Sequence, residues 1–198
     1  MIDRRFIHRL AQCSRGASAA ELALILPLIV LLFAGLIDAG RFMYEVNRGE
    51  KATQTGARMA VVTNPVAPEL STQSYVGVSV GGQLLTQGDR IPAAALSPVL
   101  CGEGSCNAMG YDDPAFTNLL GRMQQIMPSI EGANLRVEYR GSGLGYAGNP
   151  NGMDISPLVT VRLTDMTFEP VILFGGEIDL PDFAYTLTME DGQGTGSN

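Results

Sequence analysis

The order of apolar and polar positions divides the chain into an N-terminal anchor and a more polar remainder. An uninterrupted apolar run extends from Leu22 to Ile37, behind a leader that contains four arginines. Together with the small residues before it, the segment 17–37 would span about 31 Å as a helix, which matches a bilayer core of about 30 Å. The pattern therefore predicts a transmembrane helix over 17–37, in which Pro27 causes a mild kink.

A cleaved secretory signal peptide is the alternative interpretation of this segment. Such a signal has an apolar core of about 7–15 residues, followed by a cleavage motif of small residues. Here the apolar run is longer, and the A-x-A triplet beside it, Ala17-Ser18-Ala19, comes before the run and not after it. The order of the two features favours a retained anchor.

The helical pattern continues beyond the apolar run. No proline occurs from Asp38 to Val62, and mostly small residues recur there at alternating spacings of three and four. We call them the small-residue stripe: Ala39, Phe42, Val46, Gly49, Thr53, Gly56 and Ala60. Small residues at this spacing allow another helix or a sheet to approach closely. We expect the stripe to pack on the protein's own domain, an interpretation that also permits contact with other subunits.

Beyond Pro65 and Pro68, which should end the helix, the pattern changes to short strands. Residues 74–85 alternate enough to suggest a strand pair with its turn at Gly81-Gly82. Further strands are predicted at 135–139, 158–163 and 183–189. The loops between them are too short for repeated crossover helices, which implies a mostly antiparallel sheet.

One helix is predicted among these strands. Asp113 can cap its N-terminus, and Pro114 can occupy its first turn. Apolar residues then follow helical spacing from Phe116 to Met127, and Pro128 should end the helix. The predicted fold class is α+β, in which a long N-terminal membrane-spanning helix continues into a domain with a mostly antiparallel sheet and one additional short helix.

The predicted organisation has five parts. They are a basic leader at 1–16, a transmembrane helix at 17–37, its extramembrane extension at 38–62, an exported α+β domain at 63–190 and a disordered tail at 191–198.

Charge is distributed unevenly along the chain. The formal net charge is −7, but the leader carries +3, so the rest of the chain carries −10. An acidic body argues against nucleic-acid binding, which requires a basic face. A basic leader beside an apolar run is typical of an N-terminus that stays in the cytoplasm.

The three cysteines follow this division. Cys13 lies in the leader, whereas Cys101 and Cys106 frame CGEGSC, a short loop that would lie beyond the membrane. An oxidising compartment favours a disulfide between Cys101 and Cys106, and two unlinked thiols in a flexible loop are the alternative.

Few residues offer catalytic or metal-binding chemistry. The only histidine, His8, lies in the leader, which argues against an anchored hydrolase with a histidine-dependent nucleophile. Asn149, Asn151 and Asp154 could offer oxygens to calcium, but they form only half of a calcium loop, and a turn is the simpler interpretation. We therefore predict no enzymatic activity, no cofactor and no metal site.

The residues around Gly16 carry a resemblance to a known class. A basic leader, Gly16, four small or neutral residues, Glu21 and an apolar helix resemble the N-terminus of type IV prepilins and pseudopilins. In that class a prepilin peptidase cuts after the glycine, here between Gly16 and Ala17. The freed amine of Ala17 would then lie one helical turn from Glu21, and the amine of one subunit could pair with Glu21 of a neighbour.

The longer sequence segment from residue 14 to residue 62 resembles the TadE-like proteins, which are minor pseudopilins of the tight-adherence (Flp) pilus system. Leu22 follows the glutamate where the major pilin usually has tyrosine, and this chain is much longer. The resemblance therefore implies a pilin-like layout and a role as a non-enzymatic minor pilin in assembly of the pilus.

The same resemblance implies partners and a location. The partners are the membrane, prepilin peptidase, other minor and major pilins and the tight-adherence secretion machinery. The location is the bacterial inner membrane in a single pass, with a cytoplasmic N-terminus and a C-terminal domain that is periplasmic or part of the pilus. The alternative is an unprocessed single-pass membrane protein with an exported binding domain.

Overall fold

The computed structural model of this chain describes residues 17–150, 152–171, 176–189 and 192–194. The described residues form two compact units: those within 1–43 and 169–178, and those within 44–168 and 179–198. The predicted leader, including His8, Cys13 and Gly16, lies outside the described residues, as does Asn151.

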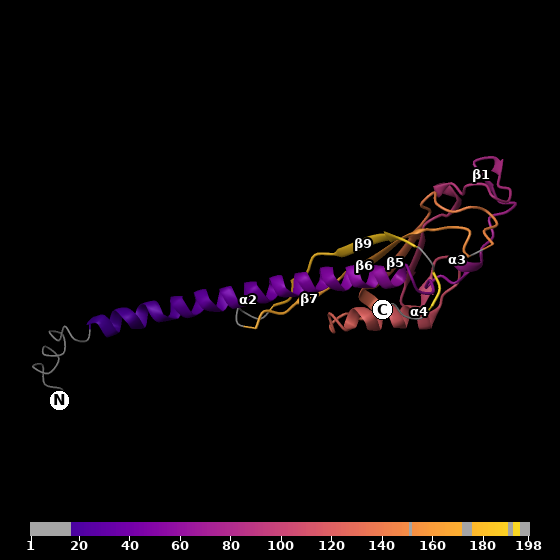
Figure 1. Cartoon of the computed structure of the whole chain (residues 1–198). Helices are drawn as coiled ribbons and strands as arrows, with labels where there is room; N and C mark the ends of the chain where they lie inside the picture. The colour runs from indigo at the N-terminus through magenta and orange to yellow at the C-terminus, as the bar shows by residue number, and fades with distance from the viewer. Residues whose placement is uncertain (1–16, 151, 172–175, 190–191, 195–198) are drawn as a thin grey trace, which may run out of the picture. The chain divides into compact units, whose positions relative to one another are not determined.

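The longest element is helix α2, Ala17–Ala60, which Figure 1 shows as an indigo-to-purple ribbon. Its 44 residues include Pro27, so the proline does not end the helix. The helix ends two residues before Val62, the predicted end of its extramembrane extension. In this last turn the N–H groups of Val62 and Thr63 both donate to the carbonyl of Met59, each at 3.1 Å.

The second unit contains a five-stranded sheet in the order β4-β3-β5-β6-β9, and every neighbouring pair in it is antiparallel. Its strands are β3 Val99–Gly102, β4 Ser105–Cys106, β5 Leu135–Arg140, β6 Leu158–Leu163 and β9 Phe183–Thr188. The predicted antiparallel sheet is confirmed, and three of its strands match the predicted segments.

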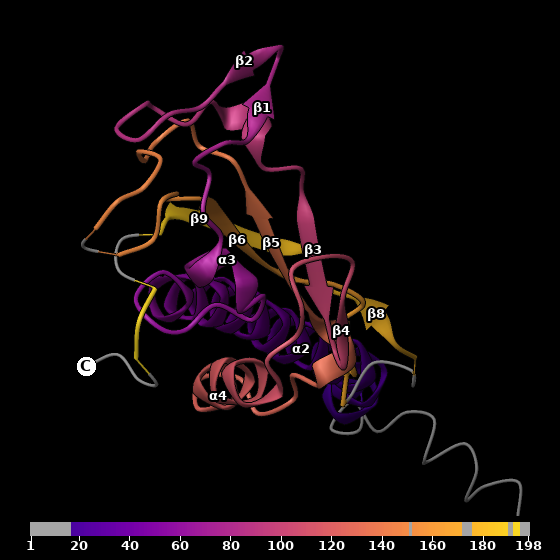
Figure 2. The ribbon, with the colours of Figure 1, turned by 90° about the vertical axis from the view of Figure 1, so that its right-hand side faces the viewer.

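Alternation along the central strands gives the sheet one strongly apolar face. Six side chains on β5 and β6 are at most 1% exposed: Leu135, Val137, Tyr139, Val159, Val161 and Leu163. Figure 2 shows helix α4, Asp113–Gln124, beside the C-terminal part of α2 on one side of this sheet. The core of the second unit therefore lies between the sheet and two helices.

Short elements complete the described chain. These are α3 Glu69–Thr72, the 3₁₀ turns Ala93–Ala95 and Gly132–Asn134, and the two-residue strands β1 Ser79–Val80, β2 Gln83–Leu84, β7 Thr167–Phe168 and β8 Ile178–Asp179. Strands β1 and β2 pair around Gly81 and Gly82, whose φ angles are +62° and +84°. Glycine suits both positions because an L side chain is strained there, so the predicted turn is confirmed.

The predicted cap of α4 was wrong by one residue. Asp112 caps the helix, because its backbone is extended and its carboxylate accepts the N–H of Ala115 at 3.0 Å. Asp113 is instead the first helical residue. The helix also ends at Gln124, before Pro128, because the N–H groups of Ile126 and Met127 turn back to the carbonyl of Met123.

Two further segments differ from the expectation. The CGEGSC segment, expected as a loop, is a tight hairpin that joins β3 to β4. In the tail, expected to be disordered, the described Gly194 exchanges two hydrogen bonds with Asn64, at 2.8 and 2.9 Å. Strand β4 has only two residues, which is too short to show alternation. The hydrogen bonds of Gly194 join positions that lie 130 residues apart, which periodicity does not reveal.

Candidate functional site

The N-terminal part of α2 exposes apolar side chains all around the helix. Between residues 22 and 37 only Ala34 is buried, and the large side chains are 38–77% exposed. A helix that is apolar on every side suits a lipid environment. Within the described residues α2 is also the one helix that is long and apolar enough to cross a membrane. The first half of α2 is therefore a candidate membrane span.

Glu21 lies at the start of this apolar surface. Its side chain is exposed, and it belongs to the same helix as Ala17, four positions earlier. Four residues of a helix rise by about 6 Å, so the two positions lie one turn apart on one face. Gly16, the third residue of the predicted processing site, lies outside the described residues.

A second polar cluster follows the apolar run at its other end. The Asp38 side chain is only 6% exposed, although it is charged and follows Ile37 directly. Its Oδ1 atom accepts the backbone N–H of Val171 at 3.1 Å and lies 3.4 Å from a guanidinium nitrogen of Arg41. Arg41 also reaches the carbonyl of Glu169 at 3.5 Å. The segment 169–171 is thus attached to α2 at the first polar turn after the span.

Sequence reasoning missed this attachment. The sequence pattern marks Asp38 only as the first polar residue after the apolar run, and the hydrogen-bond partner of its carboxylate, Val171, lies 133 positions later. The available signal was weak, because an aspartate at this position is equally expected at a helix surface in contact with water.

The C-terminal part of the small-residue stripe is a packing surface within the second unit. Gly49, Thr53, Gly56 and Ala60 are buried, and the Thr53 hydroxyl donates to the carbonyl of Gly49 at 2.8 Å. A Cβ atom at Gly56 would lie 2.6 Å from the sulfur of Met123 on α4. Packing on the protein's own domain accounts for this part of the stripe.

Position 49 also favours glycine, because a neighbouring side chain occupies the space that a Cβ atom would need. A Cβ atom there would lie 2.6 Å from the Cζ atom of Phe183 on β9, and no real contact of that kind is so short. The other stripe members are more open: Val46 and Phe42 are half-buried, and Ala39 is exposed. Contact between those residues and other subunits stays a prediction.

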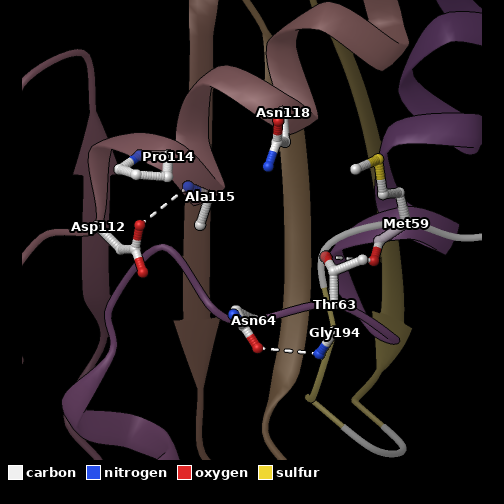
Figure 3. A pocket seen from close by; sticks show the side chains of 8 residues that line it. All are labelled: Met59, Thr63, Asn64, Asp112, Pro114, Ala115, Asn118 and Gly194. Atoms are coloured by element: carbon white, nitrogen blue, oxygen red, sulfur yellow. Dashed lines mark hydrogen bonds between the residues drawn. The ribbon is translucent and has the colours of Figure 1, made fainter.

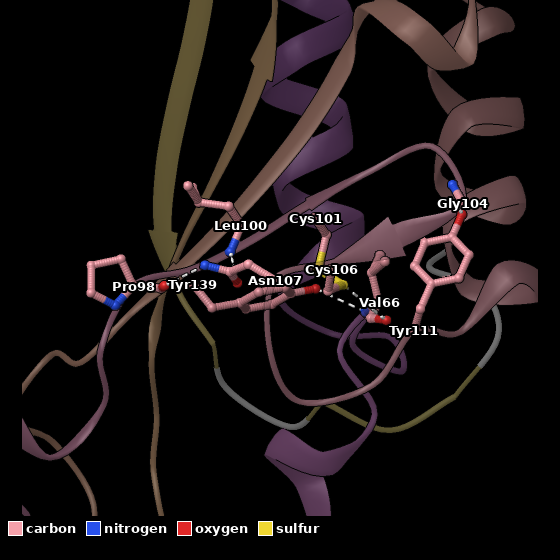
Figure 4. The surroundings of a disulfide bond; sticks show 9 residues. All are labelled: Val66, Pro98, Leu100, Cys101, Gly104, Cys106, Asn107, Tyr111 and Tyr139. Atoms are coloured by element: carbon pink, nitrogen blue, oxygen red, sulfur yellow. Dashed lines mark hydrogen bonds between the residues drawn. A yellow bond between two sulfur atoms is a disulfide. The ribbon is translucent and has the colours of Figure 1, made fainter.

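Cys101 and Cys106 are joined by a disulfide across the β3–β4 hairpin, in the surroundings that Figure 4 shows. Close by, the hydroxyl of Tyr139 accepts the backbone N–H of Val66 at 2.9 Å. Tyr139 is fully buried, and burial raises the pKa of its hydroxyl well above the ordinary value. The disulfide joins the strands at one edge of the sheet, β3 and β4, whereas this hydrogen bond connects the central strand β5 to the loop after α2.

Asp154, the candidate calcium ligand, already has three partners from the backbone. Its carboxylate accepts the N–H groups of Tyr75, Gly148 and Asn149, at 2.8–2.9 Å. Burial alone would raise the pKa of this carboxyl, but the hydrogen bonds outweigh burial and lower the pKa below its ordinary value. The arrangement is that of a side chain organising a turn.

A small cavity of about 40 Å³ lies among Met59, Thr63, Asn64, Asp112, Pro114, Ala115, Asn118 and Gly194, as Figure 3 shows. Its size suits about one water molecule. Asp112, Thr63 and Asn64 each make a hydrogen bond within its lining. Among the described residues, no three His, Cys, Asp or Glu side chains are placed to hold a metal ion.

These observations define a class of protein: its described residues contain one candidate membrane-spanning helix, and the C-terminal half of that helix is the core helix of an α+β domain. Residues 16–58 match the family model described as TadE-like protein, which confirms the resemblance seen in the sequence. The match covers 43 of the 198 residues and lies almost entirely within α2. No curated protein and no solved structure matches the chain.

Proposed function

We propose that this chain is a non-enzymatic minor pseudopilin, cut by a prepilin peptidase between Gly16 and Ala17 and then used in assembly of a tight-adherence pilus. One observation carries the proposal: Glu21 lies one turn from Ala17, at the start of an exposed apolar helix, within the TadE-like match. The predicted orientation follows from the basic leader, which would keep the N-terminus in the cytoplasm.

The proposal gives Glu21 a physical role. A carboxylate at the end of a membrane span costs less free energy when it has a partner of opposite charge than when it is alone. The amine that cleavage frees on Ala17 supplies this charge, either within one chain or to Glu21 of a neighbouring subunit. Pairing between subunits would set the axial register of the assembly, because it joins fixed positions on two parallel helices.

The processing step is tested by replacing Gly16 with leucine in cells that contain the peptidase. We expect wild-type protein to begin at Ala17 and the Gly16→Leu variant to keep its leader, because a bulky side chain blocks access to the extended backbone. N-terminal sequencing of membrane-purified protein is the measurement. The matched control is Gly40→Leu, since a Cβ atom at Gly40 meets nothing within 4 Å.

The result that contradicts the proposal is equally direct. If wild-type protein in the assembled pilus fraction still begins at Met1, the chain is not processed. The alternative, an unprocessed membrane protein with an exported binding domain, would then take its place.

A further inference from the structure

The five-stranded sheet carries three arginines on the face opposite to its buried apolar face. Arg136 and Arg140 belong to β5 and Arg162 belongs to β6, strands that Figure 2 shows side by side. Each arginine alternates with buried side chains of its strand, so all three share one face. The Arg140 and Arg162 side chains are 59% and 46% exposed, and Arg136 is also exposed. We call the outward positions of β3, β5 and β6 the basic face.

The basic face contrasts with the charge of the unit that contains it. Residues 44–168 and 179–198 hold 8 lysines and arginines against 15 aspartates and glutamates, which is a formal net charge of −7. Strands β5 and β6 hold three of these basic residues and one acid, Glu138, which leaves +2 on their outward side. A local positive surface on an acidic unit attracts groups of negative charge.

Glu138 neutralises only part of this surface. Its side chain is 8% exposed, and its two carboxylate oxygens accept hydrogen bonds from Arg140 and from Arg162, the latter at 3.3 Å. Arg136 donates instead to the backbone carbonyl of Leu135 at 2.9 Å. Within the part of the chain that the structure describes, no ion pair joins Arg136 to a carboxylate. Arg136 therefore keeps an uncompensated charge at the surface.

Arg136 also lies directly opposite Arg162 on the neighbouring strand. Like charges at such positions are destabilising, because the Cβ atoms of a directly opposed pair are only about 5 Å apart. An anion that binds between the two guanidinium groups removes this cost, and a guanidinium binds a carboxylate through two parallel hydrogen bonds. The pair therefore indicates a ligand that carries carboxylates.

Leu100 on β3 adds an apolar position to the basic face. It is paired with Glu138, which lies midway between Arg136 and Arg140 on β5, and it is 53% exposed. A groove of about 740 Å³ is lined by Leu100, Arg136 and Arg162, among others. A long polyanion such as nucleic acid has no use for the leucine and is repelled by the acidic unit. A protein segment with both acidic and apolar side chains fits both features.

The spacing along β5 defines this segment further. Four residues of a strand span about 13 Å, which is the separation of Arg136 and Arg140 along β5. An extended chain with the pattern Glu-x-Leu-x-Glu has the same spacing, so it would present a carboxylate to each arginine and a leucine to Leu100.

We propose that the basic face binds an extended acidic segment of another protein, in which acidic and apolar side chains alternate on one side. The binding surface lies within the second unit, so the proposal goes beyond the proposed function and does not depend on cleavage between Gly16 and Ala17.

The test is a titration of the full-length purified protein in nonionic detergent against the peptide SETLTES, labelled with tetramethylrhodamine and followed by fluorescence anisotropy. The matched neutral peptide is SQTLTQS, and labelled heparin represents a polyanion without apolar groups. We expect SETLTES to bind roughly tenfold more tightly than SQTLTQS, because two exposed ion pairs are lost in the neutral peptide. The difference should shrink as salt is added.

The variant Arg136→Gln locates the binding. We expect it to weaken binding of SETLTES about fivefold, which is the upper range for one exposed ion pair. Lys51→Gln is the matched control, because it removes the same charge from an exposed position on α2 in the same unit and should leave binding unchanged. Arg136→Gln should also keep or raise the melting temperature, since it removes a repulsive pair. A lower melting temperature would show that Arg136 serves the fold, which would overturn the proposal.

The remaining outcomes are also decisive. Equal affinities for the two peptides, or equal weakening by Arg136→Gln and Lys51→Gln, would overturn the proposal. Binding of heparin that depends on Arg136, without binding of SETLTES, would assign the face to a polyanion instead. Self-association of the wild type that Arg136→Gln abolishes would assign it to a second copy of this chain. Either result would exclude the proposed partner.

Discussion

Tyr139 connects the loop after α2 to the centre of the sheet through one hydrogen bond. Its hydroxyl accepts the N–H of Val66, and both residues are at most 2% exposed. A buried N–H without a partner costs more free energy than the net value of the bond it loses. At the scale of single residues, stability therefore depends on a few buried polar contacts between distant positions.

The variant Tyr139→Phe tests this contact. It removes only the hydroxyl, so the ring still fills the core while the Val66 N–H loses its acceptor. We expect the free energy of unfolding to fall by roughly 1–3 kcal/mol, measured by urea denaturation in detergent. Tyr146→Phe is the matched control, because Tyr146 is 60% exposed and should leave stability unchanged. Equal effects of the two variants would argue against the proposed role of the hydroxyl.

Asp154 leads to a prediction about pH. Because the pKa of its carboxyl is lower in the folded protein than in the unfolded chain, the folded state gains stability from the charged form. This contribution is complete above the ordinary pKa of about 4 and is lost as the pH falls through the folded value. Asp154→Asn should therefore lower the melting temperature at pH 7 and flatten its decline below about pH 4.

The control for that prediction is Glu103→Gln, which removes an exposed carboxylate from the same unit. Melting curves from pH 7 to pH 3 would be compared among the two variants and the wild type. A decline in Asp154→Asn as steep as in the wild type would show that the pH dependence arises from other groups.

At the scale of elements, the C-terminal half of α2 serves as a core helix because its small residues allow close approach. Gly49 faces Phe183 of β9, and Gly56 faces Met123 of α4. Glycine lowers helix propensity by about 1 kcal/mol relative to alanine, so its presence here needs a packing reason. The two contacts supply that reason.

Alanine substitutions separate packing from helix propensity. We expect Gly49→Ala and Gly56→Ala to lower the free energy of unfolding by about 1–2 kcal/mol, since overpacking outweighs the gain in propensity. Gly40→Ala is the matched control on the same helix, because its Cβ atom would meet nothing within 4 Å. It should be neutral or stabilising in the same denaturation experiment, and a similar loss in all three variants would contradict the packing argument.

At the scale of the whole molecule, one helix performs two tasks in succession along the chain. Its first half exposes apolar side chains on all sides, whereas its second half buries small ones within the α+β domain. Mutations in the two halves should therefore have different consequences. Changes near Glu21 are expected to act on processing and assembly, and changes from Gly49 onward on folding of the domain.

The family match follows the same division. It covers residues 16–58, which are nearly all of α2 and little of the domain beyond it. The proposed role in pilus assembly therefore rests on the N-terminal helix, while the rest of the domain is described by its own structure alone.

Much of the fold was predictable because its signals are local. The apolar run, the stripe at spacings of three and four, the Gly81-Gly82 turn and the alternating strands each require only neighbouring residues. The cap of α4 was missed by one position because two adjacent aspartates satisfy the same local rule, and only the backbone angles distinguish them.

The sequence by itself determined the candidate membrane span, the extended helix, the antiparallel strands and the position of Glu21 relative to Gly16. Only the tertiary structure decided which polar groups meet: Asp38 with Val171, Val66 with Tyr139, and Asp154 with Tyr75. These partners lie 133, 73 and 79 positions apart. Periodicity reports which face of an element is apolar, whereas a hydrogen bond between distant residues depends on how the whole chain folds, and no local pattern encodes it.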